Sequence, residues 1–285
     1  MTAAIFDGIV IGLRFGLLAA GLTLVYGLGG VLLLAYGQVT VISAVVIIFA
    51  MDAGIPALPA VGLALVAGGF MGLVLDLTIL RPVYRRHGEA RVLLSLLLTL
   101  GVAFIVDGFL NWRYPLLGLT LRIGGGPIEI IGVRMPRGSV VASAIAIVAM
   151  VGLLSFFRWT TLGRAARSVI EDQEGARLVG IDPHRMLRLI LVLSGVLAAL
   201  VAATQAMVRL IDVRSGFELT VFALIVTVVG GLGSVTGALL AGIILGIIYA
   251  IALTYIGTSL SLIILLAAAA ITIVIRPAGL LGVRE

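Results

Sequence analysis

The segment from Thr160 to Arg188 concentrates charged side chains of both signs. Apolar residues recur along it at helical spacing, and Gly180 and Pro183 follow as stop signals, so the pattern predicts a short amphipathic helix. Its polar face balances three acids against three arginines, whereas a helix held on anionic lipid should be cationic. The chemistry indicated is recognition of a groove on a partner protein. The charged residues of the segment are Arg164, Arg167, Arg177, Arg185, Arg188, Glu171, Asp172, Glu174 and Asp182.

Few other residue types in this chain could perform covalent chemistry. Cysteine is absent, which excludes disulfides, thiol nucleophiles and thiolate metal sites. Lysine is absent too, which excludes a Walker A lysine and a Schiff base. His87 and His184 lie among arginines in polar stretches, and Ser234 has no histidine or lysine base near it in sequence. We therefore expect neither an enzyme nor a metal or cofactor bound by this chain.

The composition indicates what kind of structure positions these residues. Of the 285 residues, 62% are hydrophobic and only 11% are charged, and the mean hydropathy is +1.30. Soluble domains carry about 25% charged residues, so this is an integral membrane protein. At roughly 20 apolar residues per crossing, the length allows about eight or nine transmembrane helices. We expect an all-α polytopic bundle that forms one transmembrane domain over residues 1–285.

The distribution of arginine orients the bundle. Twelve arginines fall on the side that holds residues 81–91, 158–188 and the C-terminal tail, and six fall on the other. The positive-inside rule places the richer side, with the 158–188 loop, in the cytoplasm. The net charge of +6 then reflects orientation in the membrane and does not indicate nucleic-acid binding. The candidate spans are Ile5–Leu28, Val39–Met51, Pro56–Leu80, Val92–Leu110, Val140–Phe157, Met186–Val208, Leu219–Val229, Val235–Leu253 and Leu260–Ile275.

Two of these spans, Val39–Met51 and Leu219–Val229, are too short to cross a bilayer of about 30 Å as straight helices. Both adjoin glycine-rich stretches, a pattern typical of broken helices that line a path through a membrane. The alternative is that the glycines serve close helix packing, as the pairs Gly12/Gly16, Gly233/Gly237 and Gly242/Gly246 suggest. From polarity and position, the candidate path residues are Tyr36, Gly37, Gln38, Ser43, Thr99, Thr227, Gly230, Gly231, Gly233 and Ser234.

Charged residues within the spans are functional candidates, because a charge in the membrane is costly. Asp76 precedes Arg81 by five residues, and we expect it to reach the cytoplasmic interface. Arg14 lies about a third of the way into the first span, where it either snorkels outward or faces a water-lined interior. No two carboxylates share a helical face deep in a span, so a proton relay has little support.

Several motifs resemble those of the branched-chain amino acid permeases of ABC importers (LivH type). Glu174-Gly175-Ala176 followed by Gly180-Ile181 is similar to the E-A-A-x-x-x-G loop of importer permeases, with glycine replacing the middle alanine. Tyr36 stands where the family usually has histidine in A-H-G-[EQ]. The other matching stretches are Thr161–Arg167, Gly21–Gly27, Leu80-Arg81-Pro82, Gly230–Ala238 and Arg276–Gly282.

The resemblance implies a set of partners. Two cytoplasmic ATPase subunits, which bind ATP and Mg²⁺, would dock on the 158–188 loop as a coupling helix. A second, homologous permease would complete the translocation path, and an external solute-binding protein would deliver the substrate. The location implied is the inner membrane of a bacterial cell, with lipid around the subunit. The residues implied in ATPase coupling are Arg164, Arg167, Glu171, Asp172, Glu174, Ala176, Gly180 and Ile181.

The substrate class implied is a small polar organic solute, with neutral or branched-chain amino acids first and amides or urea as alternatives. A different class, a secondary transporter driven by an ion gradient, would use similar broken helices. That class should carry buried, paired carboxylates and needs no docking helix, so mutation of Glu174 and Arg164 should leave its transport intact.

Overall fold

The computed structural model describes residues 2–86, 88–121, 126–130, 133–276 and 279–281. His87 and three residues of the last motif, Pro277, Ala278 and Gly282, lie outside them. All nine predicted spans are helical, and within the described residues six helices are long and apolar enough to cross a membrane. These six are α1 (Thr2–Gly29), α3 (Ala57–Leu75) with its π-helical continuation η1 (Asp76–Leu80), α4 (Gly88–Arg113), α5 (Arg137–Trp159), α8 (Pro183–Ala206) and α10 (Val235–Ile256). The prediction of an all-α polytopic membrane protein is confirmed.

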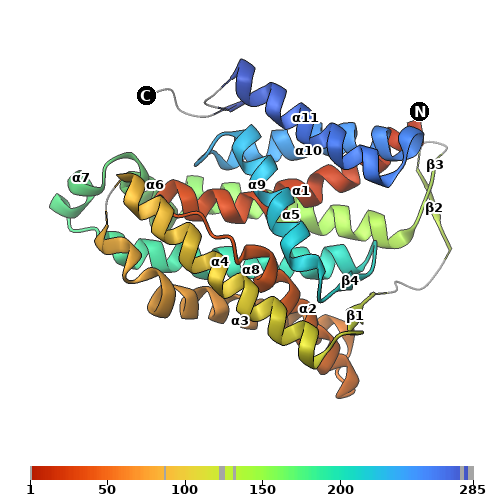
Figure 1. Ribbon diagram of the computed structural model, residues 1–285, viewed down its shortest axis with the longest axis horizontal. Helices are drawn as coiled ribbons and strands as arrows, with labels where there is room; N and C mark the ends of the chain where they lie inside the picture. Colours follow the sequence, from red (N-terminus) through yellow and green to blue (C-terminus); the bar gives the residue numbers. More distant parts are fainter. Residues whose placement is uncertain (1, 87, 122–125, 131–132, 277–278, 282–285) are drawn as a thin grey trace.

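Three shorter apolar helices complete the bundle: α2 (Tyr36–Asp52), α9 (Ser215–Gly230) and α11 (Thr258–Ile275). The polar elements gather at its two ends (Figure 1). One end, here called the α6–α7 end, carries α6 (Thr161–Glu171), α7 (Gln173–Leu178) and the 3₁₀ turn η2 (Val83–Arg85). The opposite end, the strand end, carries two antiparallel pairs. They join β1 (Gly118–Leu119) to β4 (Ile211–Asp212) and β2 (Ile128–Ile130) to β3 (Val133–Met135).

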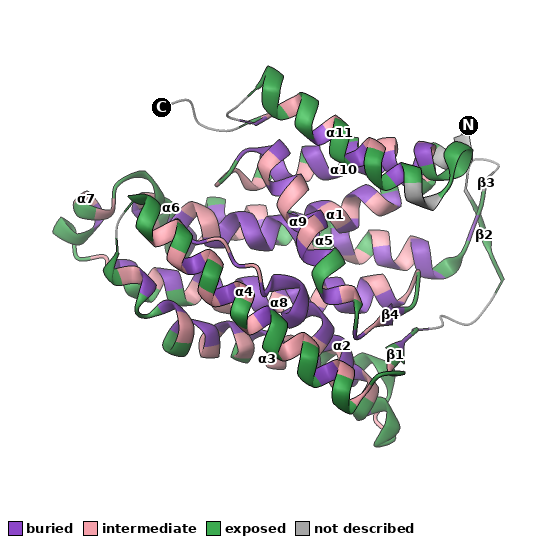
Figure 2. Cartoon of the chain, viewed as in Figure 1, coloured by how far each residue is buried: buried purple, intermediate pink, exposed green. Residues whose placement is uncertain are grey.

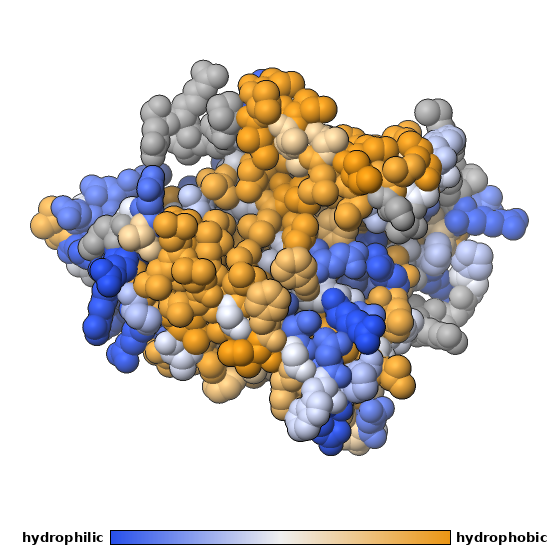
Figure 3. Space-filling model, viewed as in Figure 1, coloured by the Kyte–Doolittle hydropathy of each residue, from blue (hydrophilic) through white to orange (hydrophobic). Residues whose placement is uncertain are grey.

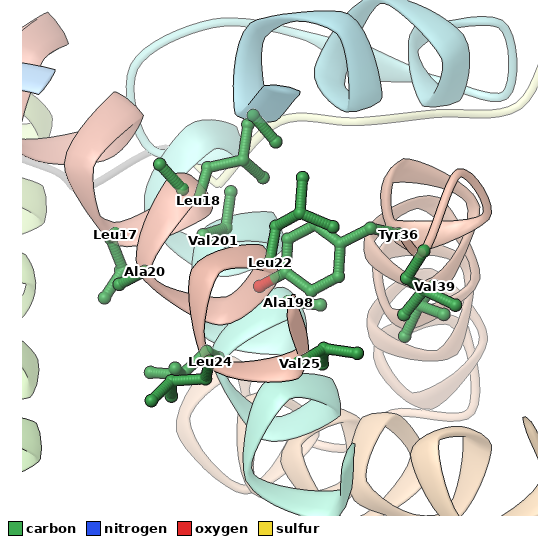
Figure 4. Close-up of a cluster of buried hydrophobic side chains, with 14 of the residues drawn as sticks. Leu17, Leu18, Ala20, Leu22, Leu24, Val25, Tyr36, Val39, Ala198 and Val201 are labelled. Atoms are coloured by element: carbon green, nitrogen blue, oxygen red, sulfur yellow. The ribbon is translucent and has the colours of Figure 1, made fainter. Parts of the chain in front are cut away.

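Helix α1 is the centre of the bundle and packs against α5, α8, α9 and α10. Its middle is fully buried, and Leu17 and Leu22 lie in one apolar cluster with Tyr36, Ala198 and Val201 (Figure 4). The N-terminal span is therefore a core element, and the side chains in its middle are enclosed by other helices.

Glycine allows α1 to approach α10 closely. A Cβ added to Gly12 would lie 2.6 Å from the Ile243 Cα, and one added to Gly242 would lie 2.5 Å from the Gly16 Cα. Backbones in contact favour helix association in a membrane, where little hydrophobic force acts between helices. The close-packing interpretation is thus confirmed for Gly12/Gly16 and Gly242/Gly246. The same kind of approach joins α3 to α8, where Gly68 and Gly195 face each other.

Between α1 and α2 the chain is not helical and turns back into the bundle. Gly30 has a φ of +57°, and residues 31–35 then lead to Tyr36. Tyr36 packs against Gly21, eight residues before the end of α1, which is about 12 Å along the helix at 1.5 Å per residue. Helix α2 therefore starts inside the bundle and runs to the strand end. This is the first of the two interrupted spans that the sequence predicts.

On the face shown in Figure 3, most of the surface between two hydrophilic ends is hydrophobic. Helices α3, α4 and α11 expose much of their length (Figure 2), including large apolar side chains such as Val66, Leu97 and Val274. An apolar belt of this kind faces lipid or another membrane subunit. The bundle is therefore a multi-pass membrane protein with charged side chains confined mostly to its ends.

Candidate functional site

The predicted amphipathic helix is in fact two helices, α6 and α7. Asp172 separates them in an extended conformation, with φ −153° and ψ 106°. Its carboxylate accepts a hydrogen bond of 3.0 Å from the Glu174 backbone N–H and so caps α7. An aspartate at this position satisfies an N–H group that has no partner within its helix. The prediction of one continuous helix was wrong because the capping tendency of Asp172 outweighed the helical spacing of its neighbours.

The end of α7 follows the predicted stop signals. Gly180 has a φ of +85°, and its N–H bonds to the Arg177 carbonyl, while the Ile181 N–H bonds to the Ala176 carbonyl. These two bonds form a Schellman motif, which requires a left-handed residue and so favours glycine. Asp182 then caps α8 at the His184 N–H. Gly180 is thus confirmed as the C-cap, and Pro183 begins the next helix.

The buried faces of α6 and α7 connect them to the core. Ala166, Val169 and Ala176 are buried in the main apolar cluster. The Gln173 side-chain amide donates a 3.2 Å hydrogen bond to the carbonyl of Leu28, at the end of α1. Because α6 also packs on α5, α8 and α1, the helix pair is in contact with the central helix and with two of its neighbours.

The outer faces of α6 and α7 are exposed and carry the predicted coupling residues. Arg164, Arg167, Glu171, Asp172, Glu174 and Gly180 are exposed, Ile181 is half-buried and Ala176 is buried. Beside these polar groups, Leu178 is 90% exposed and Val179 is 75% exposed. Two bare aliphatic side chains at the tip of a charged projection are typical of a protein-binding surface.

Asp76 belongs to a small polar cluster at the base of the α6–α7 end. Its carboxylate pairs with the Arg188 guanidinium at 3.0 Å and accepts a 3.1 Å hydrogen bond from the Tyr84 hydroxyl. Burial, together with the adjacent Asp76 charge, raises the pKa of the Tyr84 hydroxyl. The partner is therefore Arg188 and not Arg81, and the ion pair ties the end of α3 to the start of α8.

Hydroxyl groups hold the non-helical segment before α2. Thr99 accepts a 3.0 Å hydrogen bond from the Leu34 N–H and lies 3.1 Å from the Leu32 carbonyl. Ser95 accepts a bond from the Leu32 N–H at 3.2 Å. Thr220 contacts both the Leu34 carbonyl and the Gly37 N–H. In a membrane each backbone N–H or carbonyl group without a hydrogen bond is energetically costly. These three side chains supply such bonds and so allow the chain to be non-helical between α1 and α2. The sequence did not single out Thr220, because a threonine near the start of an apolar span resembles an ordinary helix residue.

The predicted path residues of α2 are buried within this chain. The Tyr36 hydroxyl donates to the Ser194 carbonyl at 3.4 Å, and Gly37 lies against the backbone of Gly216. The Ser43 hydroxyl bonds back to its own helix. The Gln38 side-chain oxygen is buried without a partner among the described residues. Of these residues, Gly37 and Gln38 contact the start of α9, at Gly216.

The glycine-rich turn after α9 brings distant motifs together. Gly231 and Gly233 have φ of +101° and +88°, so the helix ends here, and Gly233 is a turn residue that does not form a helix-packing pair with Gly237. Gly230 lies against the backbone of α10, and Gly233 lies against Gly27. The carbonyls of Val229 and Gly230 accept bonds from Leu280 and Leu281.

Two of the predicted path residues reach an open cavity. Gly233 and Ser234 line a space of about 590 Å³ at the α6–α7 end together with Arg167 of the predicted coupling set. Thr227 lies deeper and bonds to the Thr23 hydroxyl at 3.2 Å and to the Ala19 carbonyl at 3.2 Å. The structure thus places part of the predicted path directly beside the predicted coupling surface.

Comparison with known proteins agrees with this architecture. LivH, the high-affinity branched-chain amino acid transport system permease protein of Escherichia coli K12, is 28% identical over 97% of this chain and 94% of its own length. BraD of Pseudomonas aeruginosa, which carries the same description, is 26% identical over the same shares. The solved structure of PsaBC from Streptococcus pneumoniae in complex with Fab shares the fold, with a TM-score of 0.50 and 14% identity over 94% of this chain and 89% of that chain.

The family model described as "branched-chain amino acid transport system / permease component" matches residues 4–275. The match includes both interrupted spans and the α6–α7 pair. The protein therefore belongs to the family of branched-chain amino acid transport system permease components.

Proposed function

We propose that this chain is the transmembrane subunit of an ATP-driven importer in the bacterial inner membrane, forming a single transmembrane domain. The observation that carries the proposal is the α6–α7 projection, with exposed charges of both signs around Leu178 and Val179. Such a surface suits the groove of a cytoplasmic partner. The chain itself has no lysine for a Walker A motif, so ATP and Mg²⁺ would be bound by two partner ATPase subunits.

The contacts of this projection support a mechanical role. Closure of the ATPase subunits on ATP would press on α6 and α7, which are joined to the end of α1 through Gln173 and Leu28. A ligand shifts a conformational equilibrium only by binding one state better than the other. The ATP-bound partners would therefore favour the permease conformation that fits their closed grooves. Arg164, Arg167, Glu171, Asp172 and Glu174 are the side chains in position to make those contacts.

The strand end and the exposed apolar belt are the surfaces on which we propose that the other partners bind. The strand end would receive an external solute-binding protein, because its mixed charges suit a weak, steered contact. The exposed apolar belt would contact lipid and a second, homologous permease that completes the translocation path. The substrate class we propose is neutral amino acids, branched-chain ones included, with amides and urea as the alternative within the same importer class.

A secondary carrier driven by an ion gradient is the rival mechanism. It would require carboxylates inside the bundle, whereas Asp76 is the one buried carboxylate in the described part of the chain and lies at the α6–α7 end, paired with Arg188. A paired carboxylate at a helix end is poorly placed to carry an ion across the membrane. This arrangement favours the ATP-driven importer.

Gentle purification from the native membrane, followed by mass spectrometry, tests the proposal. We expect an ATPase with a Walker A motif and a second permease at near-equal amounts, together with vanadate-sensitive ATP hydrolysis. Recovery of the chain alone or only with copies of itself, without such activity, would contradict the importer. The double variant R164A/E174A separates the two mechanisms, since transport by a gradient-driven carrier should survive it.

A further inference from the structure

A cavity of about 350 Å³ lies near the strand end, between α1, α8, α9 and α10. Its size falls within the range of small-molecule sites in proteins. Figure 3 shows a group of hydrophilic side chains where Figure 1 places the connection that contains β4. The wall combines one buried cation, two polar groups and three aromatic rings, namely Arg14, Gln205, Glu218, Phe15, Phe222 and Tyr249.

Arg14 is the unusual member of this set, because its side chain faces the interior and does not snorkel. It is 7% exposed, and its guanidinium donates to the Gln205 side-chain oxygen at 2.8 Å and to the Val10 carbonyl at 3.3 Å. None of the described carboxylates lies within ion-pair distance of it. A guanidinium has five N–H donors, and a buried charge without a counter-ion is costly. The remaining donors therefore require an anion or water in the cavity.

Glu218 supplies the opposite charge at the mouth of the same cavity. Its carboxylate lies 4.0 Å from the Arg209 guanidinium, and both side chains are about half-exposed. An exposed pair at this distance contributes little to stability. The Glu218 carboxylate can therefore bind another cation in place of Arg209 with little loss of protein stability.

Aromatic rings form part of the apolar wall of the cavity. The rings of Phe15 and Phe222 are stacked with centroids 4.7 Å apart, and Tyr249 lies 5.9 Å from each of them. Packed aromatic groups give a rigid surface that an aliphatic side chain can cover. The cavity is thus lined by two cations, Arg14 and Arg209, by one anion, Glu218, and by an apolar wall.

We propose that this cavity binds a zwitterionic amino acid with an aliphatic side chain. Arg14, supported by Gln205, would hold the carboxylate of the solute, Glu218 would hold its ammonium group, and the three rings would contact its side chain. The assignment rests on the proposed importer function and gives it an entry site at the strand end. It also explains why a buried arginine is tolerated in the central helix.

Direct binding to the purified complex, without the solute-binding protein, tests the site. The probe is radiolabelled leucine, measured as saturable binding to the complex in lipid nanodiscs. We expect R14Q and E218Q each to weaken binding about 10-fold or more, since a charged hydrogen bond is lost. The matched controls R86Q and D52N remove the same groups from exposed positions outside the cavity and should bind leucine like the parent. Leucinamide and 4-methylpentanoate, which each lack one charge, should fail to compete.

Unchanged leucine binding in both R14Q and E218Q would overturn the site, and so would effective competition by either analogue or the absence of saturable binding in the parent complex. E218Q keeps the test valid if R14Q does not assemble, because Glu218 lies half-exposed at the mouth of the cavity. The proposed importer is judged separately, by copurified ATPase and vanadate-sensitive hydrolysis. A complex that passes those criteria but does not bind leucine contradicts only the site.

Discussion

Thr99 shows that a polar residue in a membrane helix can act on the backbone of another segment. Sequence polarity made it a candidate path residue, but its hydroxyl is fully buried and bridges Leu32 and Leu34. The backbone groups of this non-helical segment lack the hydrogen bonds that a helix would give them. The Thr99 hydroxyl replaces two of those bonds. Its role in solute contact stays a prediction, whereas its structural role can be measured directly.

We expect T99V to destabilise the protein by about 1–2 kcal/mol, because valine has the same shape but leaves the Leu34 N–H unpaired. The thermal unfolding midpoint in detergent should fall accordingly. T78V is the matched control, since the exposed Thr78 hydroxyl bonds to the Val74 carbonyl of its own helix. Equal midpoints for T99V and T78V would show that water or another group satisfies the segment.

At the scale of elements, the α6–α7 pair depends on one capping residue. Asp172 ends α6 and starts α7, and this change of direction lets Leu178 and Val179 project from the bundle. Gly175 is part of the same arrangement, because a Cβ there would lie 2.5 Å from the Asp172 carboxylate. This contact gives a physical reason for glycine at position 175 in place of the middle alanine of the E-A-A motif that this stretch resembles.

We expect D172A to remove the α7 cap at a cost of about 1 kcal/mol and to reduce solute-stimulated ATP hydrolysis by the assembled complex. D172N should retain most of this coupling, since asparagine caps a helix nearly as well as aspartate. The measurement is ATPase activity with and without the loaded binding protein. If both variants lose coupling equally, the charge of Asp172 and not its cap is the important property.

At the scale of the whole molecule, the sequence predicted where the helical spans lie but not which residues of different helices contact one another. Periods of apolar residues and glycine clusters identified the nine apolar helices of the described residues and both interruptions, because those features are local. The pairing of Asp76 with Arg188, more than 100 residues away, and the contact of Gly27 with Gly233 depend on how the helices pack. Arg14 was ambiguous for the same reason, since only the neighbouring helices decide whether it faces lipid or a cavity.

The exposed tip of α7 gives a prediction about the whole assembly. If the ATPase grips this projection, L178S should weaken its binding roughly 10-fold, because one central apolar contact at an interface contributes about 1–2 kcal/mol. The measurement is the amount of ATPase retained on the immobilised permease across a dilution series. L58S is the matched control, since Leu58 is similarly exposed, at 86%, but lies at the far end of the bundle. Retention that falls equally in both variants would mean that general destabilisation, and not docking at α7, controls assembly.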